Sequence, residues 1–168
     1  MKLLVLRHAV AEDREDFAAT GEDDSLRPLT KEGIWKMERI VKGLRVCARS
    51  IDLIATSPYT RAAQTAELIA RGFSKVATEQ LDALKPDSSP KALLPWLRKH
   101  QDADSVAVVG HEPHLGVVIS WLLAGKDASF VGLGKGGACM LEFESRPAQG
   151  GAIILWTLTP SLLRRLGS

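Results

Sequence analysis

Residues 3–12, LLVLRHAVAE, decide how this chain is read, because four apolar residues run straight into Arg7 and His8. A short apolar run bounded by a turn is typical of a strand that is buried on both faces of a parallel sheet. A guanidinium and an imidazole are costly to bury without partners. Their place at the end of such a strand therefore indicates a candidate functional site.

Further apolar runs alternate with helical patterns along the chain, which predicts an α/β fold with a mainly parallel sheet. The runs lie at 51–57, 105–110, 139–144 and 152–158, and a weaker one at 75–81 is a candidate edge strand. Helices are expected after the N-cap Thr30, from near Tyr59 to a stop at Gly72, from Pro90, and after Pro113. Pro95 is expected to bend or shorten the third of these helices.

The composition fits one globular domain over residues 1–168, with 45% hydrophobic and 25% charged residues. A net charge of +2 favours neither nucleic acid nor an anionic membrane as a partner. Cys47 and Cys139 are too few for a disulfide framework, and the apolar start is too short for a signal peptide. We therefore expect a cytoplasmic protein that is a monomer or a weak oligomer.

Two segments look irregular. Residues 10–28 hold seven acidic residues against two arginines, and we interpret them as a solvated surface loop in preference to a functional lid. Residues 132–138, GLGKGGA, superficially match a phosphate-binding glycine loop. Because a strand pattern follows them, where a dinucleotide fingerprint would open a helix, we interpret them as a turn.

Basic and imidazole side chains stand at three predicted strand ends, where ligands bind in open α/β sheets. Arg7 and His8 end the first strand, Arg61 falls in the first helical turn after the second, and His111 follows the third. Arginine forks and helix N-termini suit the oxygens of a phosphoryl group. The nearby charge would lower the pKa of His8 and keep it a neutral nucleophile, with His111 as a hydrogen-bond donor to the phosphoryl group.

The segment GHEPHLG at 110–116 resembles the zinc pattern H-E-x-x-H, but its two histidines are three residues apart and Pro113 lies between them. The two imidazoles cannot then share a helix face in the usual way. We therefore expect no metal site there.

The chain resembles the histidine phosphatase superfamily, in which an RHG motif ends the first strand, and more narrowly its SixA-type branch of small phosphohistidine phosphatases. The matching pieces are LRHAVAE, DSLRPLTKEG, SPYTRAAQTAE, GHEPHLG and GKGGACMLEF, in this order over essentially the full length. The resemblance implies a three-layer α/β/α sandwich of the phosphoglycerate-mutase type and no cofactor. It further implies that His8 is the phosphorylated nucleophile and that Arg7, Arg61 and His111 complete the phosphate pocket.

Two departures from the family pattern bear on chemistry. Ala9 replaces the usual glycine after the RH pair, which adds a methyl group beside the pocket. Larger family members carry an acid that protonates the leaving oxygen, and here only Asp82 and Asp13 are candidates. A pocket without a dedicated acid suits a P–N bond, because an imidazole leaving group can itself carry the proton.

We therefore predict a metal-independent phosphatase that uses a covalent phosphohistidine and removes phosphate from phosphohistidine on a partner protein. One alternative is a phosphatase of a small phosphomonoester. The other is a phosphate-binding module without turnover.

Overall fold

The computed structural model describes residues 1–168, and its centre is a six-stranded sheet in the order β3-β2-β4-β1-β5-β6. The strands are Lys2–Arg7 (β1), Leu53–Thr56 (β2), Thr78–Gln80 (β3), Ser105–Gly110 (β4), Ala138–Glu142 (β5) and Ile153–Leu158 (β6). Strands β3, β2, β4 and β1 run parallel, whereas β5 and β6 are antiparallel to their neighbours. The prediction of a mainly parallel sheet with a weak strand at one edge is confirmed.

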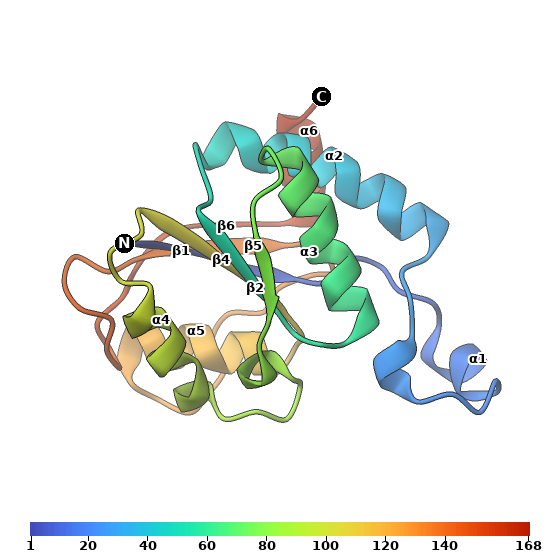
Figure 1. The fold of residues 1–168 in the computed structure, drawn as a ribbon, viewed down its shortest axis with the longest axis horizontal. Helices are drawn as coiled ribbons and strands as arrows, with labels where there is room; N and C mark the ends of the chain where they lie inside the picture. The colour runs from blue at the N-terminus through green and yellow to red at the C-terminus, as the bar shows by residue number, and fades with distance from the viewer.

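Helices cover both faces of this sheet, which confirms the three-layer arrangement (Figure 1). They are Arg14–Ala18 (α1), Lys31–Cys47 (α2), Thr60–Gly72 (α3), Leu94–Lys99 (α4), His114–Ala124 (α5) and Pro160–Leu166 (α6), with short 3-10 turns at Asp24–Leu26, Asp82–Leu84 and Pro90–Leu93. Figure 1 shows α2, α3 and α6 on one side of the sheet and α4 and α5 on the other. None of these helices is long and apolar enough to cross a lipid bilayer.

Strand β1 is buried on both faces, as its unbroken apolar run predicts. Leu4 and Leu6 belong to the apolar cluster under α2 and α3, while Leu3 and Val5 belong to the cluster under α5. Successive side chains of a strand point to opposite faces, so one strand joins both halves of the core.

The second expected helix ends at Gly72 as predicted, although Phe73 is the C-cap residue. Pro95 shortens the third helix to six residues, preceded by a 3-10 turn. Thr30 caps α2 as predicted, because its Oγ1 accepts from the Gly33 amide at 2.9 Å. The sequence patterns missed α1 and α6, since both helices are too short to show a clear apolar period.

Candidate active site

The carboxyl ends of β1, β2 and β4 meet at one edge of the sheet. Arg7 pairs in register with Gly110, the His8 amide donates to the Gly110 carbonyl at 3.0 Å, and the Ser57 amide donates to the Val109 carbonyl at 2.9 Å. A pocket of about 720 Å³ opens there. Its lining includes all four residues that the sequence singled out, Arg7, His8, Arg61 and His111.

His8 is held as a neutral imidazole in one tautomer. Its side chain is almost completely buried, and Nδ1 lies 2.7 Å from the carbonyl oxygen of Ala9. A carbonyl can only accept, so Nδ1 carries the hydrogen and Nε2 keeps a free lone pair. Burial is the main cause that lowers the pKa of His8 to about 3; the bond to Ala9 opposes this shift, and the charges of Arg61 and Arg7 add to it.

His111 lies beside His8, with their ring centroids 5.1 Å apart. It is 2% exposed, and its Nε2 lies 2.8 Å from Ser57 Oγ. Its Nδ1 is buried and has no hydrogen-bond partner. Burial is the main cause that lowers the pKa of His111 to about 3, and electrostatic interactions with the neighbouring His8 and with Arg61 add to it, so this ring is also neutral near pH 7.

The two arginines are anchored by their terminal nitrogens. Arg7 Nη1 donates to the Leu133 carbonyl at 2.8 Å, while Arg61 Nη1 and Nη2 donate to the backbone and side chain of Asp24 at 2.8 and 3.0 Å. The Nε atom of each arginine is buried and has no partner.

Three buried nitrogens without partners, Arg7 Nε, Arg61 Nε and His111 Nδ1, thus belong to residues that line one pocket with His8. Each unsatisfied buried donor costs about 1–3 kcal/mol, so native proteins rarely keep several together. A tetrahedral oxyanion offers several acceptor oxygens and a negative charge. The arrangement is chemically suited to hold such a group beside His8.

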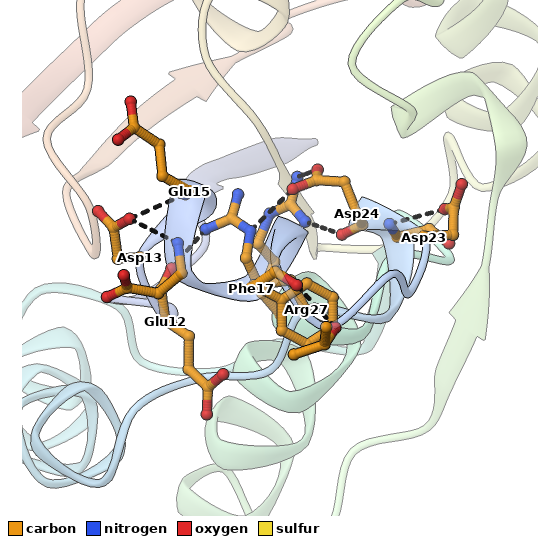
Figure 2. Close-up of polar contacts among 11 residues, drawn as sticks. Glu12, Asp13, Glu15, Phe17, Asp23, Asp24 and Arg27 are labelled. Atoms are coloured by element: carbon orange, nitrogen blue, oxygen red, sulfur yellow. Dashed lines mark hydrogen bonds and ion pairs between the residues drawn. The ribbon is translucent and has the colours of Figure 1, made fainter.

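The acidic segment 10–28 is tied to this site, so the interpretation as a solvated surface loop is wrong for Asp24 and Arg27. Figure 2 shows their polar contacts: Arg27 Nε donates to Asp24 Oδ1 at 2.8 Å, and Arg27 Nη1 donates to the Glu12 carbonyl at 2.7 Å. Burial would raise the pKa of Asp24, but the hydrogen bond from Arg27 and the charge of Arg61 hold it below its ordinary value. Asp24 therefore remains a carboxylate between two arginines. Asp24 stands three residues before Arg27, and this spacing could have indicated from the sequence that the two side chains pair.

The glycine-rich segment at residues 132–138 is a turn, as predicted, and it also stabilises the backbone of Arg7 and His8. The Gly136 amide donates to the carbonyls of Arg7 and His8 at 3.1 and 3.2 Å. Gly136 has φ of +81°, a backbone conformation that L side chains rarely adopt, so glycine is favoured at this position. The turn also brings Lys135 to the pocket lining, which the sequence analysis missed because the packing partner of the turn was unknown.

The two candidate acids lie in different places. Asp82 is absent from the pocket lining, and its 81% exposed side chain pairs with Lys85 at 2.9 Å. Asp13 does line the pocket, where it caps α1 by accepting from the Asp16 and Glu15 amides. These hydrogen bonds lower the pKa of Asp13, so it is held as a carboxylate.

Ala9, which replaces the family glycine, is accommodated without backbone strain. Its methyl group is buried in the cluster under α2 and α3, its amide donates to Thr65 Oγ1 at 3.0 Å, and it is not among the residues with positive φ. No group of three or more His, Cys, Asp or Glu side chains is placed to hold a metal ion.

Comparisons with known proteins agree with this geometry. The family model of the histidine phosphatase superfamily (branch 1) matches residues 3–85. An uncharacterized protein of Picosynechococcus sp. is 32% identical over 139 residues, which are 82% of each chain. Phosphohistidine phosphatase SixA of Escherichia coli K12 is 26% identical over 129 residues, which are 75% of this chain and 76% of that protein.

Two solved structures show how widely the fold is used. The protein histidine phosphatase SixA complexed with tungstate has a TM-score of 0.80 at 22% identity, covering 97% of this chain and 99% of that one. The alpha-ribazole phosphatase from Shigella flexneri has a TM-score of 0.73 at 16% identity, covering 95% of this chain and 97% of that one. These likenesses concern the fold, which hosts phosphatases of protein and small-molecule substrates alike.

The sequence comparisons and the geometry of the pocket agree. The chain matches the family model, a 32% identical relative and the SixA homologue. Its strand ends place two histidines and two arginines in one pocket. This chain is a phosphatase that belongs to the histidine phosphatase superfamily, in its SixA-type branch.

Proposed function

We propose that this phosphatase forms a covalent phosphohistidine on His8 and that its substrate is phosphohistidine on a protein. The observation that carries the proposal is the state of His8. Its pKa near 3 leaves the ring neutral, and the bond from Nδ1 to Ala9 leaves the Nε2 lone pair free. A neutral imidazole with a free lone pair is a competent nucleophile toward phosphorus.

The three unpartnered donors would hold the non-bridging oxygens during transfer. Arg7 and Arg61 supply positive charge, and His111 supplies a neutral N–H. Such preorganised donors stabilise the charge that redistributes in the transition state of phosphoryl transfer. Lys135 adds a further positive charge close enough to lower the pKa of His8.

In the first step, His8 Nε2 attacks phosphorus, the new N–P bond forms, and the bond from phosphorus to the leaving atom breaks with its electron pair. The substrate imidazole, which already carries a proton from solvent on its other ring nitrogen, takes the electron pair of the broken P–N bond and leaves as a neutral ring, so the pocket need not supply a proton. In the second step, water attacks the phosphorus and the His8 N–P bond breaks with its electron pair returning to Nε2. One proton of the water stays on the inorganic phosphate that leaves, and the other goes to solvent. His8 returns to the neutral form.

The surroundings of the pocket support a P–N bond as the one that is cleaved. An alkoxide leaving group needs a proton donor, whereas an imidazole is a better leaving group and can carry the proton itself. Asp82 points to solvent, and Asp13 is held as a carboxylate by its capping role. The name of the Escherichia coli relative, a phosphohistidine phosphatase, supports the same substrate class.

The proposal is tested with two substrate sets offered at equal concentration, a phosphohistidine-bearing protein and a panel of phosphomonoesters of small metabolites. We expect the phosphohistidine protein to be turned over with the higher kcat/KM. Radiolabelled phosphate from it should be trapped on the enzyme in an acid-labile, base-stable form.

The His8→Ala variant is the matched control, and it should acquire no label. Faster turnover of one phosphomonoester would move the assignment to a small-molecule phosphatase. Label trapped equally on His8→Ala would rule out His8 as the nucleophile, and release of phosphate by neither substrate set would favour a binding module.

A further inference from the structure

We propose that Ser57 is a positioning residue that holds His111 in the tautomer with its hydrogen on Nδ1, so that Nδ1 donates to the transferred phosphoryl group. The inference rests on the proposed function. It concerns a side chain to which the sequence analysis assigned no role.

The side-chain hydroxyl of Ser57 is buried and has two hydrogen-bond partners. It stands directly after β2, is 0% exposed, and its Oγ lies 2.8 Å from His111 Nε2. The same Oγ accepts from the Tyr59 amide at 3.3 Å. No other hydrogen bond involves this hydroxyl.

These partners decide which group donates. The Tyr59 amide can only donate, so it occupies one lone pair of Ser57 Oγ. If His111 Nε2 also donated, the hydroxyl hydrogen of Ser57 would be buried without an acceptor, at a cost of about 1–3 kcal/mol. The arrangement in which Ser57 donates to Nε2 satisfies the Ser57 hydroxyl, the Tyr59 amide and His111 Nε2 together. His111 is neutral at this site, so its single ring hydrogen is then on Nδ1.

The Nδ1 atom is the buried nitrogen of His111 that has no partner in the protein. With a hydrogen it offers the phosphoryl oxygens a donor, whereas the other tautomer would offer them a lone pair and repel them. The relay from the Tyr59 amide through Ser57 to His111 therefore makes a neutral imidazole act as a donor without protonation. A hydrogen bond also fixes the tautomer of His8, but there it leaves a lone pair free. The Ala9 carbonyl keeps the His8 hydrogen on Nδ1 and leaves Nε2 free to attack.

The test reads the tautomers directly by ¹⁵N NMR of the imidazole nitrogens in the ligand-free protein near pH 7. In the parent, His111 should carry its hydrogen on Nδ1. In Ser57→Ala this population should fall in favour of Nε2–H, while the tautomer of His8 stays unchanged as an internal reference. The kcat/KM should fall about tenfold, the fold-change expected for one hydrogen bond, and Ser57→Thr should restore the tautomer.

Ser120→Ala is the matched control, because Ser120 is also 0% exposed and does not line the pocket. Like the Ser57 hydroxyl, its hydroxyl accepts from a backbone amide, that of Phe130, and it donates to the Gly116 carbonyl. This variant should move neither the His111 tautomer nor kcat/KM. If Ser57→Ala folds poorly, Ser57→Cys keeps the volume, offers only a weak donor and should shift the tautomer in the same direction.

An unchanged His111 tautomer in Ser57→Ala or Ser57→Cys overturns the inference and leaves the proposed function intact. Conversely, full activity of His8→Ala removes the proposed function whatever the tautomers show. The two failures are therefore distinguishable.

Discussion

Replacing Arg61 by alanine should lower kcat/KM by about 10² to 10³, which corresponds to about 2.7–4 kcal/mol for one preorganised charged donor at a transition state. The contacts of Arg61 explain why kcat/KM should fall. Arg61 lines the pocket, uses Nη1 and Nη2 to hold Asp24, and has a buried Nε without a partner. The variant keeps His8 as a nucleophile, but the phosphoryl group loses one donor and one positive charge.

Arg61→Lys should recover only part of this loss. A lysine carries a single nitrogen, which can hold Asp24 or reach the pocket but cannot reproduce the fixed fork that serves both. The free energy of unfolding should fall by only about 1–2 kcal/mol in Arg61→Ala, because Asp24 is 36% exposed and keeps its bond to Arg27.

The assay combines steady-state hydrolysis of a phosphohistidine protein with inhibition by tungstate, whose oxygens mimic the transferred group. Arg71→Ala is the control on the same helix, since Arg71 is 69% exposed and pairs loosely with Glu67 at 3.8 Å. It should leave rate, inhibition and melting temperature unchanged. Parental rate and tungstate affinity in Arg61→Ala would refute the reasoning and make Arg61 a structural partner of Asp24 alone.

Three further predictions concern the same pocket. His8→Ala should abolish turnover and keep the parental circular dichroism spectrum; a parental rate would end the claim of covalent catalysis. Activity should survive exhaustive treatment with EDTA, because Arg7 and Arg61 supply the positive charge; a loss that zinc or magnesium restores would contradict this. Urea unfolding should show stability falling as the pH drops from about 6.5 toward 3, because His8 and His111 have folded pKa values near 3 and bind protons mainly when unfolded. Each should contribute up to about 1.4 kcal/mol per pH unit, and His8→Ala should flatten the slope; an unchanged slope would show that His8 is not buried as a neutral base.

The local sequence determined the parallel strands and the main helices, because their signals are carried within single segments. The buried strand β4 was predicted with its observed bounds, and Thr30 marked the start of α2. The strand ends also pointed to Arg7, His8, Arg61 and His111 together, since parallel strands place their carboxyl ends at one edge of a sheet. The short helices α1 and α6 were not predicted because five and seven residues are too few to show a clear apolar period. Helix α6 packs closely on α2, where a Cβ at Gly43 would collide with the Leu163 carbonyl.

Only the tertiary structure decided how these residues work. Asp24 meets Arg61 from a position 37 residues earlier in the chain, and the turn at Gly136 donates to the carbonyls of Arg7 and His8 across more than 120 residues. The neutral state of both histidines comes mainly from burial, and their tautomers depend on the Ala9 carbonyl and, as we propose, on Ser57. Desolvation and hydrogen-bond partners are properties of the packed chain, so residue type and spacing can nominate a nucleophile but cannot set its protonation.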